Sequence, residues 1–144
     1  MTATIYAISI SARRGELKKE IAEANVLDGF GLEGDGHGGD WDRQITCLNW
    51  GSVAASNAEH HLNMGPGDFA ETILIDGMDT LQLQPGDRFQ LGDTVVLEVS
   101  QIGKPDHPSV VTRTFGVSLL PHEGLFCRVI RGGHIQKGDT VVKL

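Results

Sequence analysis

The residues best suited to chemistry lie in a glycine-rich segment between residues 31 and 46. Within it, Asp35, His37 and Arg43 supply a carboxylate, an imidazole and a guanidinium. Glycine occupies five of the nine positions from 31 to 39. It permits positive φ angles and close approach of a ligand to the backbone, at a cost in folding entropy. This combination predicts the wall of a polar pocket.

Two other segments carry polar residues that could meet this wall. Glu71 lies in one, and the run 104–107 supplies Lys104, Asp106 and His107 in the other. Taken singly, a loop aspartate is commonly a turn former and a loop histidine is commonly solvated. Taken together, these residues predict a pocket that binds a small anion.

Other signatures point away from familiar cofactor sites. Residues 29–34 match G-x-G-x-x-G, but no strand precedes the match and no helix start follows it, as a dinucleotide site requires. The six histidines lack the paired spacing of zinc motifs, so we expect no metal ligated by the protein. Cys47 and Cys127 are too few and too far apart for a disulfide framework, which favours reduced, packed thiols.

Short strands must position these residues. Residues 52–62 predict one helix, with Ser52 as its N-cap and Ala54, Ala58 and Leu62 on its apolar face. Residues 16–26 are compatible with a short helix or with an extended, charged connector. Gly92-Asp93 predicts a two-residue hairpin turn, and residues 125–130 are expected to pair with 140–144. The expected strands are 4–11, 45–50, 69–75, 88–91, 94–102, 125–130 and 140–144.

Length and composition predict one mainly β domain over residues 1–144, a compact closed β-barrel with one or two short helices. Nineteen glycines are about twice the average usage. The net charge of -7 argues against nucleic acid and an anionic membrane as partners. We expect a cytoplasmic location, because no apolar segment has the length of a membrane span and the N-terminus lacks a signal core.

The whole chain resembles the MOSC domain, the family named for the C-terminal domain of molybdenum cofactor sulfurase. The resemblance is to free-standing, bacterial-type members. It is carried in order by Ser11-x3-Gly15-x2-Lys18, Gly31-Leu32-x-Gly34-Asp35-x-His37-x-Gly39-x3-Arg43-Gln44, Pro66-Gly67-Asp68-Phe69-Ala70-Glu71, Gly77-Met78-Asp79, Gly86-Asp87-Arg88-Phe89-x-Leu91-Gly92, Val99-Ser100-Gln101-Ile102-Gly103-Lys104, Pro121-x-Glu123-Gly124-Leu125-Phe126-Cys127-Arg128-Val129-Ile130 and Gly133-x-Ile135-x3-Gly138-Asp139.

The resemblance implies a barrel similar to that of pyruvate kinase, and activity in molybdenum cofactor or sulfur metabolism. Family members are thought to carry sulfur as a cysteine persulfide, or to bind the molybdenum cofactor through that cysteine. Molybdenum ion binding and pyridoxal phosphate binding are implied at the same level, as are cofactor biosynthesis proteins as partners. The implied cofactor-binding residues are Lys18, Asp35, Arg43, Glu71, Thr72 and Lys104.

The sequence departs from the family pattern at two positions. Asp106 stands where relatives have the cysteine, and Thr72 stands where they tend to have Asn. A carboxylate is a hard ligand that cannot transfer sulfur, so a sulfur carrier is not assured. Cys127 is the other candidate thiol, and its apolar surroundings favour packing.

Three functions remain open. In the first, Arg43 and Lys104 hold an anionic cofactor while His37 handles protons, and the family resemblance then favours an enzyme. In the second, the protein is an accessory module that holds a pterin or another small anion. In the third, Asp106 and His107 support lyase or hydrolase chemistry without a thiolate.

Overall fold

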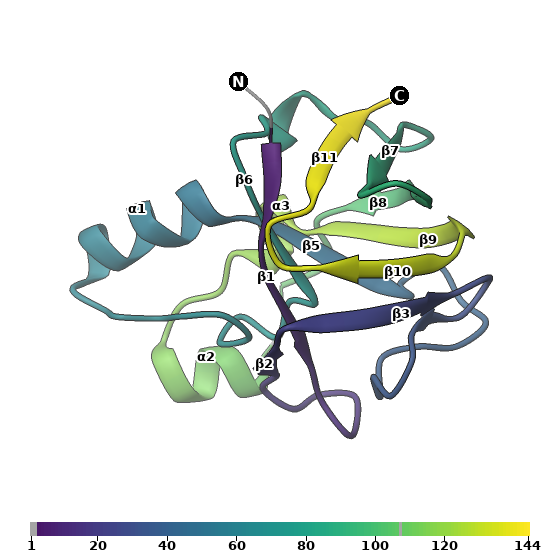
Figure 1. Cartoon of the computed structure of the whole chain (residues 1–144). Helices are drawn as coiled ribbons and strands as arrows, with labels where there is room; N and C mark the ends of the chain where they lie inside the picture. Colours follow the sequence, from purple (N-terminus) through teal and green to yellow (C-terminus); the bar gives the residue numbers. More distant parts are fainter. Residues whose placement is uncertain (1–2, 107) are drawn as a thin grey trace.

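The computed structural model describes residues 3–106 and 108–144, and it is built mainly from short β-strands (Figure 1). Three short helices accompany them among these residues, α1 (Trp50–His60), α2 (Val110–Phe115) and α3 (Leu120–Glu123). The strands are β1 (Ala3–Ile10), β2 (Lys19–Ile21), β3 (Glu23–Leu27), β4 (Gly31–Leu32), β5 (Ile45–Asn49), β6 (Ile73–Asp76), β7 (Arg88–Leu91), β8 (Val95–Ile102), β9 (Leu125–Arg131), β10 (Gly133–Gln136) and β11 (Thr140–Lys143).

Seven strands close into a barrel, in agreement with the predicted fold class. Their order is β11-β7-β8-β9-β5-β6-β1, and β1 pairs with β11 to complete the circle. Neighbours are antiparallel except β5 and β6, which run parallel. Closure leaves the barrel without an open sheet edge, so its backbone groups are paired all around.

The barrel interior is the main hydrophobic core. On β7, for example, Phe89 and Leu91 are fully buried while Arg88 is exposed, which is the alternation expected of a strand with one face inward. Core side chains come from every barrel strand: Ala3, Ile5, Ile8, Ile45, Cys47, Ile73, Ile75, Phe89, Leu91, Val95, Leu97, Val99, Leu125, Cys127, Val129 and Val141.

A second apolar cluster lies between the barrel and the helices. Leu48 and Phe126 contribute from barrel strands, Val53 from α1, and Val111 from α2. Figure 1 shows α1 and α2 on the same side of the barrel. This cluster fixes the helices against the barrel and supports the site described below.

The first half of the chain differs from the sequence prediction in several elements. Residues 16–26 form neither a helix nor a connector, but contribute β2 and β3. Helix α1 begins two residues earlier than predicted, because Asn49 and not Ser52 accepts the capping hydrogen bond, from Gly51. Val53 and Ser56 are its buried residues, whereas Ala54 is exposed. The strand predicted over 69–75 begins only at Ile73.

The later strands lie where the sequence predicts them, but not all of them pair as predicted. The hairpin of β7 and β8 is confirmed, although three residues separate the paired Leu91 and Val95, with Gly92 at φ 61°. β9 and β11 do not pair with each other, because β9 lies between β8 and β5 while β11 lies between β7 and β1. β10 joins β3 and β4 in a separate small sheet.

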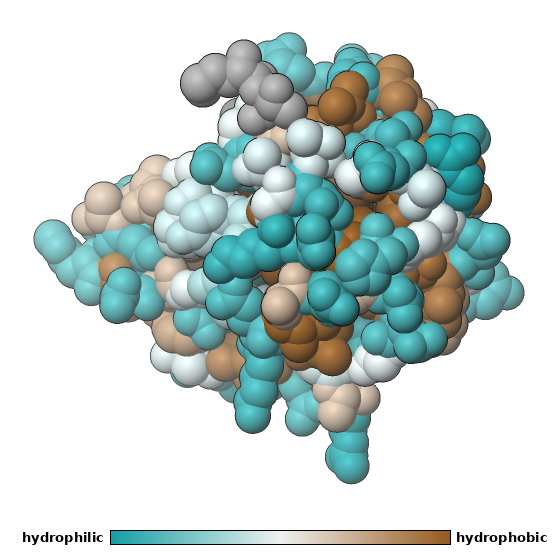
Figure 2. Space-filling view, viewed as in Figure 1, coloured by the Kyte–Doolittle hydropathy of each residue, from teal (hydrophilic) through white to brown (hydrophobic). Residues whose placement is uncertain are grey.

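The outer surface is mostly hydrophilic on the face shown in Figure 2, where hydrophobic residues form several separate patches. No helix in the described part of the chain is both long enough and apolar enough to cross a bilayer.

Candidate functional site

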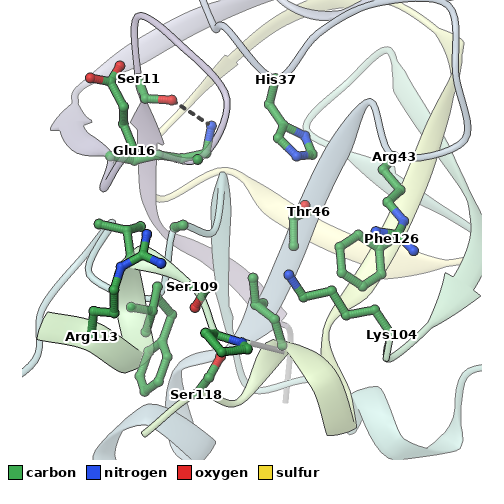
Figure 3. A pocket seen from close by; sticks show the side chains of 18 residues that line it. Ser11, Glu16, His37, Arg43, Thr46, Lys104, Ser109, Arg113, Ser118 and Phe126 are labelled. Atoms are coloured by element: carbon green, nitrogen blue, oxygen red, sulfur yellow. Dashed lines mark hydrogen bonds between the residues drawn. The ribbon is translucent and has the colours of Figure 1, made fainter. Parts of the chain in front are cut away.

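A cavity of about 280 Å³ lies where the connecting loops and helix α2 meet one end of the barrel (Figure 3). Its walls come from segments that are distant in the sequence, including both the glycine-rich segment and the segment after β8. The lining residues are Ser11, Gly15, Glu16, Lys18, His37, Arg43, Thr46, Phe69, Ala70, Lys104, Pro108, Ser109, Val110, Val111, Arg113, Ser118, Leu120 and Phe126.

Cationic side chains dominate the charge of this cavity. Lys18, Arg43, Lys104 and Arg113 line it, and Glu16 is the one carboxylate among its described lining residues. In Figure 3, Arg113 lies on one side and Lys104 with Arg43 on the other. A concave site lined by one sign of charge concentrates ligands of the opposite sign. The arrangement therefore favours an anion.

Lys18 is held by a buried ion pair. Its Nζ lies 2.6 Å from Oδ1 of Asp35, and both side chains are almost completely buried. The same carboxylate oxygen accepts a hydrogen bond from the Ser11 backbone at 3.1 Å. Asp35 is not among the lining residues. It lies behind the wall, fixing Lys18 and joining the Ser11 turn to the glycine-rich segment.

His37 reaches the cavity from the glycine-rich segment. Burial, reinforced by the positive charge of Lys18, lowers the pKa of His37 from 6.5 to about 4, so the imidazole is neutral at neutral pH. Its ring packs against Trp41, with centroids 4.8 Å apart. Nδ1 is buried and has no hydrogen-bond partner among the described residues. His37 thus contributes an uncharged imidazole to the cavity wall.

Arg43 and Lys104 form the cationic wall. The Arg43 guanidinium lies 4.9 Å from the centroid of the Phe126 ring, and its Nη2 is 3.4 Å from Oε1 of Gln101. Lys104 is half-buried, and burial together with the charge of Arg43 lowers the pKa of its amine, while Asp106 opposes the shift. No hydrogen bond or ion pair joins its Nζ to another described residue.

Glu71 and Thr72 lie behind the wall. The Glu71 carboxylate accepts hydrogen bonds from the backbone of Gly67 at 2.8 Å and of Phe69 at 3.1 Å. It thereby holds the turn that presents Phe69 and Ala70 to the cavity, with Ala70 at φ 63°. Burial raises the pKa of Glu71 to about 7. Thr72 accepts a 3.4 Å hydrogen bond from the backbone of Thr46, a lining residue.

Asp106 is not among the residues that line the cavity. Asp106 is exposed and lines a neighbouring groove with Pro108, Thr112 and Arg113. His107 lies outside the described residues. The structure therefore brings Lys18, His37, Arg43 and Lys104 together, with Asp35, Glu71 and Thr72 as their support. The catalytic roles assigned to Asp106 and His107 stay predictions.

Several lining residues were not found from the sequence. Arg113, Ser109 and Ser118 belong to helix α2 and its flanks, a region with no predicted element. Ser109 and Thr112 form a reciprocal capping box there. The sequence signature of that motif places Glu or Gln at the position of Thr112. The sequence thus contains a capping box, but with Thr112 in place of the usual Glu or Gln it does not match the motif.

Both cysteines lie away from the cavity. Cys47 and Cys127 are fully buried in the barrel core. Burial, with Cys47 alongside, raises the pKa of the Cys127 thiol, so this sulfur stays protonated and inert. In the described part of the chain, no three His, Cys, Asp or Glu side chains are placed to hold a metal ion.

Comparison with known proteins identifies the family. The family model described as the MOSC domain matches residues 33–142. The chain belongs to the MOSC domain family. No curated protein sequence matches this MOSC chain.

Solved structures share its fold at low identity. The YuaD protein of Bacillus subtilis is 20% identical, with a TM-score of 0.79 over 98% of this chain and 94% of that one. YiiM of Geobacillus stearothermophilus is 18% identical, with a TM-score of 0.77 over 99% and 75%. YiiM of Escherichia coli is 20% identical, with a TM-score of 0.70 over 98% and 69%.

The MOSC family is linked to the molybdenum cofactor, so the fit of that group can be tested against the lining residues. The resemblance implies a cysteine thiolate as metal ligand or persulfide carrier, and such soft chemistry needs an accessible sulfur. The cavity has none among its lining residues, and both cysteines are enclosed in the core. The residues present do not fit sulfur-ligated molybdenum.

Proposed function

We propose that this MOSC protein binds a small organic anion of the pterin type, without thiolate or persulfide chemistry. The observation that carries the proposal is the meeting of Arg43, Lys104 and Arg113 around a partly apolar cavity. Guanidinium and ammonium groups are the usual protein partners of phosphate and carboxylate. Because Lys18 is already neutralised by Asp35, the other three cations are the ones available to a ligand.

The remaining walls suit a flat ring. Phe69, Val111 and Phe126 give the cavity apolar surfaces, and a neutral His37 adds one polar contact. Small-molecule sites combine apolar walls with a few polar groups that fix orientation. A pterin phosphate, the organic part of the molybdenum cofactor, has this chemistry. Cofactor biosynthesis proteins stay the predicted partners of this protein.

Fluorescence titration with pterin-6-carboxylate tests the proposal. We expect saturable binding that weakens as salt screens the charges. Lys104→Gln and Arg113→Gln each remove one charged partner, and each should weaken binding about 10-fold to 100-fold. Lys143→Gln removes the same charge from β11, away from the cavity, and should bind like the wild type. Absence of binding, or equal weakening by Lys143→Gln, would overturn the proposal.

Sulfur analysis tests the second half of the proposal. The purified protein should release no sulfur on cyanide treatment, because neither thiol is accessible. The Asp106→Cys variant restores a thiol on an exposed segment and serves as the positive comparison. Cyanide-releasable sulfur mapped to Cys47 or Cys127 of the wild type would contradict a persulfide-free site.

A further inference from the structure

We propose that Lys104 is a nucleophilic amine that forms an imine with a carbonyl-bearing ligand in the cavity. This inference rests on the proposed function and narrows it: the ligand would carry an aldehyde or ketone in addition to its ring and its anionic group. The observation behind it is the contrast between two lysines that line the cavity: Lys18 is bound to a carboxylate, whereas Lys104 has no such partner among the residues that the structure describes.

The backbone around Lys104 is fixed in a way that aims its side chain inward. Gly103 donates to the Gly124 carbonyl at 2.9 Å, and Lys104 donates to the Pro121 carbonyl at 3.0 Å. Gly103 has φ 71°, and a Cβ there would meet Pro121. Figure 3 shows the Lys104 side chain extending into the cavity toward Thr46. The backbone from which Lys104 extends is therefore fixed beside the cavity.

The two lysines have different charged neighbours. Lys18 lies 2.6 Å from Asp35, which stabilises its charged form. Lys104 has Arg43 as a charged neighbour within the cavity, and Asp106, the acidic group among the described residues that opposes this effect, is exposed. Partial burial and a neighbouring cation both favour the neutral amine, and these are two known ways in which proteins activate lysine as a nucleophile.

The reaction balances without an oxidant or reductant. The lone pair on Nζ of Lys104 attacks the carbonyl carbon, and the carbon–oxygen π electrons move to oxygen. Proton transfer from nitrogen to oxygen gives a carbinolamine. Loss of that oxygen as water leaves a carbon–nitrogen double bond, and hydrolysis reverses each step. Arg113, across the cavity from Lys104, would hold the anionic end meanwhile.

Reductive trapping tests this step. The protein is incubated with cyanoborohydride and 6-formylpterin, which has the ring and the aldehyde but no anionic group, then digested and mapped by mass spectrometry. We expect one dominant adduct, at Lys104, that excess pterin-6-carboxylate suppresses. 6-Hydroxymethylpterin lacks the aldehyde and should give no adduct. Lys104→Arg should abolish the adduct, whereas Lys143→Arg, on exposed β11, should leave it unchanged.

The possible outcomes distinguish failure of the imine inference from failure of the proposed function. If pterin-6-carboxylate binds but Lys104 is labelled no more than exposed Lys19 or Lys137, the imine inference is wrong and the proposed function stands. A second probe, 4-formylbenzoate, carries an aldehyde and an anion but no pterin. If it labels Lys104 selectively while pterin-6-carboxylate does not bind, the imine stands and the pterin proposal falls.

Discussion

Glu71 links the stability of the cavity wall to pH. Its carboxyl has a pKa of about 7 in the folded protein against 4.5 in a model peptide, mainly because it is buried. Between these values the folded chain binds more protons than the unfolded chain. The contribution of the protonated acid is therefore complete below pH 4.5 and is lost as the pH rises through 7, by at most about 3 kcal/mol.

Denaturant unfolding from pH 5 to 8 measures this effect. We expect the difference in unfolding free energy between the wild type and Glu71→Gln to fall as the pH rises from 5 to 7, because the amide does not titrate. His37 acts in the opposite direction, since its lowered pKa raises stability as the pH rises from about 4 to 6.5. It does so equally in both proteins, so their difference isolates Glu71. Parallel pH profiles would contradict the assignment.

Asp35 is expected to matter far more to stability than other acidic partners of lysine. Asp35→Asn leaves the Lys18 ammonium buried and unpaired, which should cost about 3–5 kcal/mol of unfolding free energy. Glu20→Gln breaks the exposed pair with Lys137, whose atoms are 3.1 Å apart, and should cost less than about 1 kcal/mol. Chemical denaturation of both variants checks the contrast, and similar losses would argue against it.

At the scale of elements, the turn that presents Phe69 and Ala70 carries backbone strain. Ala70 adopts φ 63°, a conformation that costs an L-residue about 1–2 kcal/mol. Ala70→Gly should stabilise the protein by up to about 1 kcal/mol, because glycine's greater unfolded entropy offsets part of the relief. Ala54→Gly, on the exposed side of helix α1, should instead destabilise it by about 1 kcal/mol. If the two variants shift the melting temperature in the same direction, Ala70 is not strained.

Which elements the sequence predicts depends on how locally each is determined. In the hairpin of β7 and β8, β7 alternates between buried and more exposed residues and Gly92 begins the turn into an apolar β8, so the pattern is visible in one segment. Helix α2 is not visible in this way, because residues 110–115 are rich in β-branched side chains that disfavour isolated helices. Its capping box and the burial of Val111 against the barrel outweigh that preference.

The candidate site, too, could be predicted only in part from the sequence. Residue types and spacing placed His37, Arg43 and Lys104 in one predicted pocket and the resemblance added Lys18, and all four line the cavity. The distinction between residues that face a ligand and residues that hold them could not be predicted. Asp35 and Glu71 are carboxylates in polar segments, yet burial and hydrogen bonds direct both toward the protein. Such roles depend on tertiary distances, which spacing along the chain does not encode.

At the scale of the whole molecule, the closed barrel encloses both thiols. Neither Cys47 nor Cys127 should react with a thiol reagent such as DTNB in the native state, and both should react on unfolding. Their labelling rates should follow global opening of the barrel and fall together when the protein is stabilised. Fast labelling of either thiol under native conditions, measured by absorbance and peptide mapping, would show that a sulfur is accessible.

Asp106 lies on an exposed segment beyond the end of β8, outside both apolar clusters. Since neither cluster packs against Asp106, a substitution at this position is expected to leave the barrel and the cavity walls intact.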